Sequence, residues 1–368
     1  MTLWGHLINL IGQLEGMKSV IRDVSLCKSN RLTIDAIIYS LQKHGGISVY
    51  ANELLRRLVR DNADVGVLSY GGPLPVTLAQ SATVMPVRKL ERYRNLRLQH
   101  ATIFHSTYYR TAVGNGVRNV TTVYDFTYEL FASGPRRWVH SAQKFAAIRK
   151  SDAIICISEN TKRDLHRFLP DVPERRIVVV PNGVSESYFP LDGLASTGAP
   201  KVLFVGVRAG YKNFESVVRA LSLRPEYMLL AVGGGAFTAD ENALLRDLIP
   251  ERYSHAGLVT DEVLNALYNQ AYCLVYPSAY EGGGIPVLEA MRAGCPVIAS
   301  HSSSIPEVAG SAAILLEAAS PEGIAGALDA LQAPAYRSQL RASGFLQAAQ
   351  FSWETTYQRT REVYDSLV

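Results

Sequence analysis

The chain of 368 residues contains only four cysteines, and they stand far apart at Cys27, Cys156, Cys273 and Cys295. No CxxC pair and no cysteine–histidine cluster has the spacing of a zinc site, so no structural zinc centre is predicted. Scattered cysteines in or beside apolar segments favour a reducing compartment, and we expect a cytoplasmic protein.

Long apolar runs and strong charge are also missing. No run of about eighteen apolar residues is present, so no membrane span is expected, and the first residues lack the basic start of a signal peptide. The net charge of +4 is mild. It does not call for nucleic acid, and no glycine–aromatic RNA motif is found, so no nucleic-acid partner is expected.

The composition is that of a foldable chain, with 48% apolar and 19% charged residues. A length of 368 residues is too great for one hydrophobic core, so two domains are expected. Residues 190–200 are rich in Pro, Gly, Ser and Thr and are interpreted as the linker. Apolar strand segments followed by glycine turns and amphipathic helices recur on both sides, which predicts the α/β class with parallel sheets.

The stretch from Tyr276 to Ala299 organises the chain. The apolar run 271–276 predicts a buried strand, the loop 281–284 contains three successive glycines, and Pro286 suits the first turn of a helix. Gly294 is expected to end that helix. The bare amides and the positive helix end predict a site for a negative group, most simply a phosphate. Carboxylates at Glu281 and Glu289 indicate that hydroxyls flank the phosphate, as in a nucleotide sugar.

The sequence Glu281-Gly-Gly-Gly-Ile-Pro-Val-Leu-Glu289 resembles the Glu-x7-Glu signature of the retaining glycosyltransferases of family 4. The resemblance implies the GT-B architecture, in which two Rossmann-like domains face each other across a cleft. It continues through the Pro-Asn-Gly-Val segment 181–184 and the segment 301–310, covering nearly all of the second domain and patches of the first. The domains implied are an extension at 1–31, an acceptor domain at 32–186, a nucleotide-sugar domain at 187–350 and a returning C-terminal helix at 351–368.

The resemblance also implies a donor site built from both domains. Glu281 would hold a hydroxyl of the donor sugar and Glu289 the ribose. Gly45 and Gly46 resemble the family's first glycine loop and would approach the donor phosphates. The other donor-binding residues implied are Gly206, Leu258, Val259, Leu264, Gly282, Gly283, Gly284 and Ile285, of which Leu258, Val259 and Leu264 would line the base pocket.

Charge stabilisation of the leaving diphosphate is assigned to Lys212 and Arg208. Lys212 matches a family position, whereas Tyr211 stands where the family usually has arginine, and Arg208 in the same loop would supply the second positive charge. The sequence contains no Asp-x-Asp pair, which disfavours a transferase that depends on manganese or magnesium. No metal and no cofactor other than the donor substrate is therefore expected.

Acceptor residues are expected where two strands of the first domain end, since ligands of open α/β sheets bind beyond the carboxyl ends of strands. His105 and Asp125 occupy such positions, and Asp125 would orient or deprotonate an acceptor hydroxyl. Tyr124 stands where the family often has histidine. Gly283 likewise replaces a common phenylalanine, which would widen the pocket beside the donor sugar.

Basic residues gather between positions 88 and 100, namely Arg88, Lys89, Arg92, Arg94 and Arg97, with His100 just beyond. They are interpreted either as a solvated helix face or as a patch for an acidic lipid surface or a lipid-diphosphate acceptor. The segment 1–31 carries a loose helical apolar pattern. It is interpreted as a helix packed on the first domain, as a loosely ordered extension or as a membrane-surface helix.

These observations predict a retaining, metal-independent hexosyltransferase of cell-surface polysaccharide synthesis. Its partners would be a nucleotide-diphosphate sugar, with GDP-mannose or a related GDP-sugar favoured, and a saccharide or lipid-linked acceptor, with peripheral contact at the inner face of the membrane left open. The alternatives are a catalytically silent GT-B scaffold, motivated by Tyr124, Tyr211 and Gly283, and a GT-B phosphorylase or sugar-nucleotide epimerase.

Overall fold

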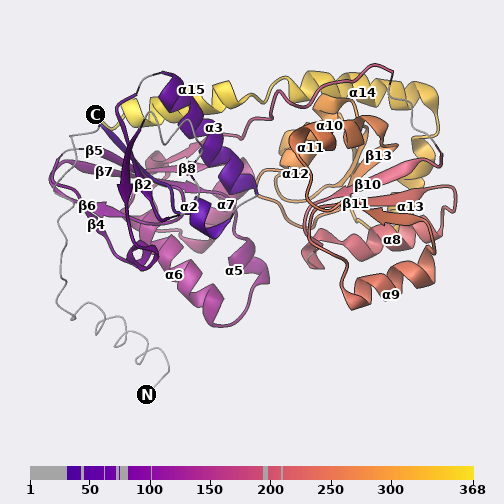
Figure 1. Cartoon of the computed structure of the whole chain (residues 1–368), viewed down its shortest axis with the longest axis horizontal. Coiled ribbons are helices and arrows are strands. Elements are labelled where there is room, and N and C mark those ends of the chain that lie inside the picture. The colour runs from indigo at the N-terminus through magenta and orange to yellow at the C-terminus, as the bar shows by residue number, and fades with distance from the viewer. Residues whose placement is uncertain are drawn as a thin grey trace.

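The computed structural model describes residues 31–42, 45–61, 63–71, 74, 82–100, 102–193, 198–208 and 210–368. These residues form two α/β lobes that lie side by side along the long axis of the molecule (Figure 1). Of the predicted N-terminal extension, residues 1–30 lie outside the described residues.

The first domain is built on a seven-stranded parallel sheet in the order β3-β2-β1-β5-β7-β8-β9. Helices cover the central strands, and β8 is apolar and buried at every position. The strands are β1 (Leu32–Asp35), β2 (Val65–Ser69), β3 (Thr83–Pro86), β5 (Thr102–Ser106), β7 (Val117–Val123), β8 (Ala153–Cys156) and β9 (Ile177–Val179), with β4 (Leu96–Arg97) paired to β6 (Ala112–Val113). The helices are α2 (Ile38–Leu41), α3 (Gly46–Arg60), α5 (Thr127–Phe131), α6 (Pro135–Lys150) and α7 (Glu159–Phe168), with short 3₁₀ turns η1 (Lys89–Tyr93) and η2 (Glu174–Arg176).

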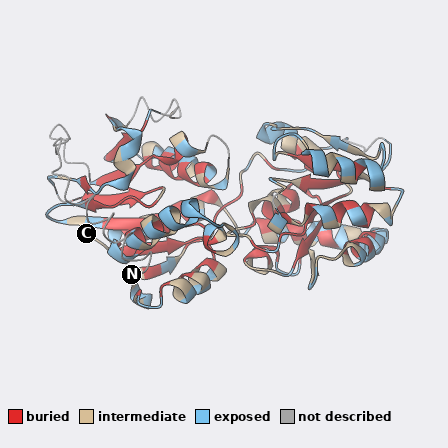
Figure 2. Cartoon of the chain, turned by 90° about the horizontal axis from the view of Figure 1, so that it is seen from below, coloured by how far each residue is buried: buried red, intermediate tan, exposed pale blue. Residues whose placement is uncertain are grey.

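The second domain repeats the plan with a six-stranded parallel sheet in the order β12-β11-β10-β13-β14-β15. Figure 2 shows buried strands inside half-exposed helices in both lobes. The strands are β10 (Lys201–Val205), β11 (Met228–Val232), β12 (Tyr253–His255), β13 (Cys273–Tyr276), β14 (Val297–Ser300) and β15 (Ile314–Leu316). The helices are η3 (Gly210–Lys212), α8 (Phe214–Ser222), α9 (Ala239–Leu248), α10 (Asp261–Gln270), α11 (Ile285–Ala293), α12 (Ile305–Ala309), α13 (Pro321–Ala330) and α14 (Pro334–Ala348).

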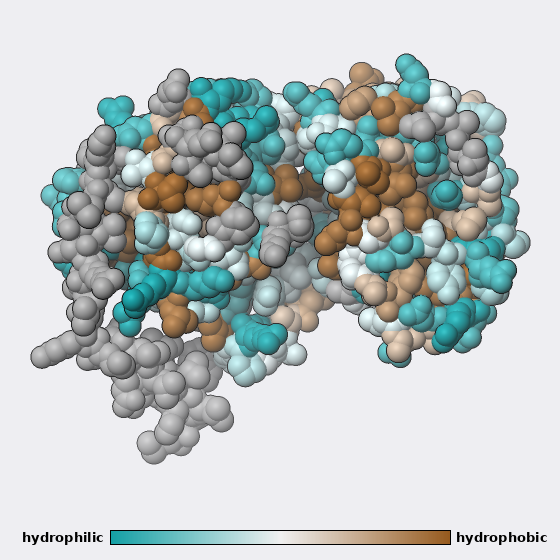
Figure 3. Space-filling model, viewed as in Figure 1, coloured by the Kyte–Doolittle hydropathy of each residue, from teal (hydrophilic) through white to brown (hydrophobic). Residues whose placement is uncertain are grey.

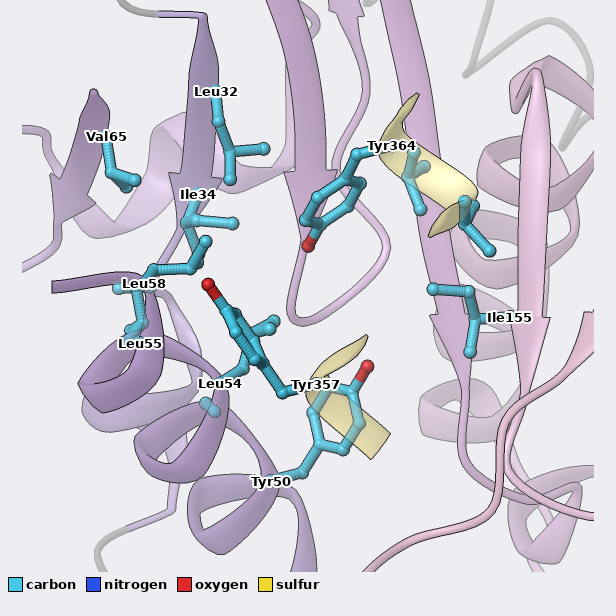
Figure 4. Close-up of a cluster of buried hydrophobic side chains, with 14 of the residues drawn as sticks. Leu32, Ile34, Tyr50, Leu54, Leu55, Leu58, Val65, Ile155, Tyr357 and Tyr364 are labelled. Atoms are coloured by element: carbon cyan, nitrogen blue, oxygen red, sulfur yellow. The ribbon is translucent and has the colours of Figure 1, made fainter. Parts of the chain in front are cut away.

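The last helix, α15 (Trp353–Asp365), leaves the second domain and packs on α3 of the first. Figure 1 shows α14 and α15 as one yellow band that spans both lobes. Tyr357 and Tyr364 insert into the core of the first domain beside Leu54 and Leu58 (Figure 4). Gly183 passes so close to the backbone of Trp353 that no side chain fits there. The C-terminal helix therefore ties the two domains together.

Local sequence signals account for several element ends. Ser158 is the N-cap of α7, because its Oγ accepts the Thr161 N–H at 3.0 Å. Gly294 ends α11 in the left-handed conformation with φ 79°, as predicted. The apolar segment from Thr33 to Tyr39 is a strand only as far as Asp35, since the Asp35 carboxylate accepts the Ile37 N–H at 3.3 Å and the chain turns into α2. The basic segment from Arg88 onward forms a 3₁₀ turn and the two-residue strand β4 instead of a long helix.

Candidate active site

The loop 277–284 between β13 and α11 is fixed from three sides. Asn213 donates its side-chain amide to the carbonyl of Pro277 at 2.9 Å, and the N–H of Ala279 bonds the carbonyl of Tyr211 at 2.8 Å. Ser303 Oγ accepts the Glu281 N–H at 2.8 Å, and Ser304 donates to the Glu281 carbonyl at 2.9 Å. Gly284 starts α11 with φ 57°, which favours glycine. The loop is thereby held with Gly282 against Tyr124 and with Gly283 against Ile157 and Asn182 of the first domain.

Lys212 and Glu281 form an ion pair at the base of this loop. The Lys212 ammonium donates to Glu281 Oε1 and lies 3.4 Å from the hydroxyl of Tyr276. Both side chains are nearly buried, with exposed fractions of 11% for Lys212 and 12% for Glu281. A buried cation beside a hydrogen-bonding carboxylate can meet a phosphate oxygen and a sugar hydroxyl at adjacent points. The structure thus brings together two residues predicted from segments far apart in the sequence.

Tyr211 lies between the predicted donor and acceptor residues. Its ring stacks on Phe131 of the first domain with centroids 5.1 Å apart, and Lys212 Nζ lies 5.5 Å from its centroid. Burial and the negative charges of Glu281 and Asp125 raise the pKa of its hydroxyl to about 12. The phenol is therefore a neutral hydrogen-bond donor at physiological pH, whereas an arginine at this position would be charged.

Asp125 reaches the donor loop from the carboxyl end of β7. A Cβ on Gly282 would overlap the carbonyl oxygen of Tyr124 and would lie 3.0 Å from the Cβ of Asp125. Asp125 Oδ1 accepts the Thr127 N–H at 2.9 Å, which orients the carboxylate at the start of α5. Only glycine at position 282 lets the two domains approach this closely.

The first glycine loop also faces the second domain. Gly45 precedes α3 with φ 155°, and a Cβ on Gly46 would lie 3.8 Å from Cδ1 of Ile285. The loops after β1 and β13 therefore meet across the interdomain cleft. Figure 3 shows a recess between the two lobes at this level, with apolar surface on its second-domain side.

Two further hydrogen-bond bridges cross the cleft. The hydroxyl of Tyr280 donates to Asp164 Oδ2 at 2.7 Å and accepts the N–H of Phe126 at 2.9 Å. The carboxylate of Glu307 accepts the N–H groups of Glu159 and Asn160, each at 2.7 Å, at the N-terminus of α7. A carboxylate at a helix N-terminus is stabilised by both the free N–H groups and the helix dipole. Sequence reasoning missed both bridges, although Tyr280 immediately precedes Glu281.

Glu289 lies one turn into α11 and is half-buried beside Tyr268 and Tyr188. The hydroxyl of Tyr268 donates to Glu289 Oε2 at 3.0 Å. Burial raises the pKa of the Glu289 carboxyl to about 7, while the hydrogen bond from Tyr268 opposes that rise. The carboxyl can therefore accept or donate a hydrogen bond near neutral pH, which suits a hydroxyl partner.

Arg208 does not face the cleft, contrary to the prediction that it stabilises the leaving group. Its guanidinium bonds Glu241 Oε1 at 2.9 Å and the carbonyls of Gly233, Gly235 and Ala236 at 3.0, 2.9 and 2.9 Å. Its side chain is 3% exposed. Five donors in a planar fork suit the several acceptors of a glycine turn, so Arg208 shapes the turn after β11.

His105 and Tyr124 also depart from the acceptor role predicted for their side chains. His105 is 1% exposed, and its ring nitrogens bond Tyr364 and Thr122 at 2.6 and 2.8 Å. Burial lowers the pKa of the His105 ring to about 3, so it is neutral. Tyr124 is 4% exposed and packs its ring on Tyr50, leaving only its backbone at the cleft. Both side chains point into the core of the first domain, on the side of the sheet that α15 covers.

The remaining donor predictions lie at the same edge of the second domain. Gly206 ends β10 with φ 119° and bonds the carbonyl of Val232 at 2.9 Å. Leu258 is 73% exposed after β12, while Val259 and Leu264 pack against the second core. Their role in a base pocket stays a prediction. Among the described residues, no group of three His, Cys, Asp or Glu side chains could hold a metal ion, and no helix is long and apolar enough to cross a membrane.

Known proteins resemble both domains. The family model described as Glycosyltransferase Family 4 matches residues 44–188, and the model described as Glycosyl transferases group 1 matches residues 192–343. The chain is 30% identical over 274 residues to the O-antigen chain mannosyltransferase B of Escherichia coli, covering 68% of this chain and 71% of that protein.

Solved structures share the two-domain arrangement. The structure of WaaG, a glycosyltransferase involved in lipopolysaccharide biosynthesis, superimposes with a TM-score of 0.70 at 15% identity, covering 90% of this chain and 99% of that one. Anabaena Alr3699/HepE, solved in complex with UDP and glucose, superimposes with a TM-score of 0.72 at 13% identity and covers 92% and 100%. At these identities the likeness shows the fold alone.

Proposed function

Because the chain belongs to the glycosyltransferases of the group 1 and family 4 type, with the GT-B fold, we propose a specific reaction for it. A hexose moves from a nucleotide-diphosphate sugar to a hydroxyl of a saccharide or lipid-linked saccharide in cell-surface polysaccharide synthesis. The anomeric configuration is retained and no metal takes part. The observation that carries the proposal is the Lys212–Glu281 pair, which faces Asp125 across the cleft.

The leaving diphosphate gains negative charge as the bond to the anomeric carbon breaks. Lys212 is placed to meet that charge, and the amides of the loop 282–284 with the start of α11 add the positive end of a helix dipole. The guanidinium of Arg208 is bound to Glu241 and to the turn after β11. Lys212 alone is therefore proposed to stabilise the leaving diphosphate, a role predicted from the sequence for both cations. Its partner Glu281 would accept a hydrogen bond from a hydroxyl of the donor sugar.

Asp125 is the group proposed to act on the acceptor. One oxygen is held by the Thr127 N–H, so the other can accept the hydrogen of the attacking hydroxyl. The hydroxyl oxygen then forms the new bond to the anomeric carbon on the face that the diphosphate leaves. Neutral Tyr211, with its ring between Lys212 and Phe131, can donate a hydrogen bond to either oxygen-rich substrate.

The donor is proposed to be GDP-mannose or a related GDP-sugar, a choice supported by the mannosyltransferase that the chain resembles. Incubation of the purified chain with labelled GDP-mannose, UDP-glucose, UDP-galactose and dTDP-rhamnose, with and without EDTA, tests it. Transfer from one donor that survives EDTA, with an α-linked product from an α-linked donor, is the expected outcome. Binding without turnover would favour a catalytically silent scaffold. Phosphate-dependent cleavage would instead indicate a phosphorylase, and epimer formation would indicate a sugar-nucleotide epimerase.

A peripheral contact with an anionic membrane, at the inner face and from the cytoplasm, completes the proposal. The 3₁₀ turn η1 lies against the middle of α6, since Gln143 donates to the carbonyl of Arg92 at 3.1 Å. Leu90 of η1 is 79% and Trp138 of α6 is 56% exposed. Basic residues neighbour them in the sequence, namely Arg88, Lys89, Arg92, Arg94, Arg97, Arg136 and Arg137.

Exposed apolar side chains among cations suit a bilayer with anionic head groups. We expect the chain to co-float with vesicles that contain phosphatidylglycerol and to remain in solution with neutral phosphatidylcholine vesicles. Exchange of Leu90 and Trp138 for serine should weaken co-flotation while leaving transfer to a water-soluble acceptor intact.

A further inference from the structure

Asn182 is a buried side chain with an unsatisfied amide oxygen in the described structure. It follows β9 in the segment Pro181–Val184 and is 6% exposed. Its Oδ1 atom is buried and has no hydrogen-bond partner within the described parts of the chain. A buried amide oxygen that loses water without gaining a partner destabilises the folded protein, so its position calls for a reason.

The fold satisfies other buried asparagines. Asn119 bonds both the carbonyl and the N–H of Ala112, at 3.0 and 2.8 Å, and the Asn265 oxygen accepts the N–H of Phe189 at 3.0 Å. These two side chains hold loops in place, which is the usual work of a buried carboxamide. Asn182 differs from them because it reaches the boundary between the domains.

The amide of Asn182 faces the loop that carries Glu281. A Cβ on Gly283 would lie 3.2 Å from Asn182 Nδ2 and 3.1 Å from Cδ1 of Ile157. Gly283 is two residues from Glu281, and the loop at this point has no side chain that could cover the amide. Gln42, whose Oε1 is likewise buried and unpartnered in the described structure, adjoins Gly45 in the facing glycine loop. Carboxamide oxygens without a partner among the described residues thus stand at both glycine loops that meet across the cleft.

We propose that Asn182 is a substrate-binding residue whose amide hydrogen-bonds a hydroxyl of the sugar ring bound beside Gly283. The inference rests on the proposed sugar transfer and adds a residue from the first domain to the sugar site. A carboxamide has both a donor and an acceptor, as a sugar hydroxyl does, and it carries no charge that would select phosphate. The stability lost in the free protein is recovered when the hydroxyl supplies the missing partner.

The absence of a side chain at Gly283 is part of this site. Any side chain there would press on the amide of Asn182 and on Ile157 and would cover the atom that the sugar needs. The two positions should therefore act on the same interaction. Gly283→Ala and Asn182→Leu should each weaken sugar binding, and the double variant should lose less than the product of the two separate losses.

The test compares Asn182→Leu with Asn119→Leu as a matched control. Leucine has the same branching and the same number of side-chain heavy atoms as asparagine and needs no hydrogen bond, so Asn182→Leu should keep or raise the melting temperature while kcat/KM falls roughly 10-fold. Asn119→Leu should lower the melting temperature and leave kcat/KM per folded molecule near that of the wild type. A rise in KM for the donor alone or for the acceptor alone identifies which sugar Asn182 binds.

Binding separates this inference from the proposed reaction. In thermal-shift titrations, Asn182→Leu should respond to bare GDP and UDP as the wild type does. It should lose the additional stabilisation that a nucleotide sugar or the acceptor saccharide gives. If the wild type transfers no sugar, the proposed reaction fails and the titration still decides the role of Asn182. Full activity with unchanged sugar binding, or a fall in melting temperature equal to that of Asn119→Leu, would overturn the inference.

Discussion

Tyr280→Phe should impair closure of the cleft while leaving each domain folded. Phenylalanine differs from tyrosine only in lacking the hydroxyl. In Tyr280 this hydroxyl donates to Asp164 at 2.7 Å and accepts the N–H of Phe126 at 2.9 Å. Phe126 directly follows Asp125, and Tyr280 directly precedes Glu281. The bridge therefore sets the distance between the predicted acceptor carboxylate and the predicted donor carboxylate.

The size of the effect follows from the two bonds. A bond to a charged carboxylate contributes about 1.5–3 kcal/mol and one to a neutral N–H about 0.5–1.5 kcal/mol. Water can replace both when the domains part, and Asp164 keeps a bond from Asn160 at 3.0 Å. A net loss of about 2 kcal/mol is the reasonable expectation, which lowers the ratio of closed to open molecules roughly 30-fold.

The assay pairs steady-state kinetics with small-angle X-ray scattering. We expect kcat to fall roughly 10- to 30-fold and the radius of gyration with bound nucleotide to exceed that of the wild type. Tyr357→Phe is the matched control, because Tyr357 also bonds an aspartate, Asp61 at 2.8 Å, but within the first domain and α15. Wild-type turnover and shape in Tyr280→Phe, or an equal loss in Tyr357→Phe, would refute the reasoning.

Three other predictions concern the same site. Lys212→Ala should lower kcat roughly 100-fold or more per folded molecule. Arg208→Ala should chiefly lower the melting temperature, because the turn 233–236 loses its donors; comparable turnover per folded molecule in the two variants would contradict this. Gly282→Ala should abolish turnover, since its Cβ would overlap the Tyr124 carbonyl, while Gly326→Ala, with open space around it, should be silent in the same transfer assay. Because burial raises the pKa of Glu289 to about 7, the folded state binds an extra proton, so this carboxyl's contribution to stability is full below its unfolded pKa of about 4.3 and is lost as pH rises through 7. Between pH 5 and 8, the melting temperature of Glu289→Gln should therefore fall less steeply with rising pH than that of the wild type. An equal pH dependence in the two proteins would show that Glu289 does not take up this proton.

Local sequence was sufficient wherever one segment contains the whole signal. The apolar run, glycine loop and proline around Pro286 predicted β13 and α11 correctly, and Gly294 was predicted from its own neighbourhood to end α11. The loop residues Lys212 and Glu281 were placed in one site from their separate motifs, and the structure joins them in an ion pair. Such features depend on backbone conformations that a few adjacent residues determine.

Side-chain direction was where the sequence failed. Arg208 and His105 lie in or near segments that end at the cleft, yet one turns toward the carbonyls of residues 233–236 and the other toward Tyr364 of α15. The hydrogen-bond partners of these two side chains are distant in the sequence. Each side chain adopts the rotamer that reaches those partners, and a local motif does not show where they lie.

The sequence by itself determined the fold class, the two-domain plan and the chemistry of the loop around Glu281, because each rests on short-range periodicity or on one continuous motif. Only the tertiary structure decided which residues face one another. The Tyr280 and Glu307 bridges, the approach of Gly282 to Tyr124, and the unpaired amide of Asn182 each depend on how two separately folded domains dock. These residues are far apart in the sequence, so no local pattern connects them. Whether their polar groups find hydrogen-bond partners depends on how the two domains pack against each other.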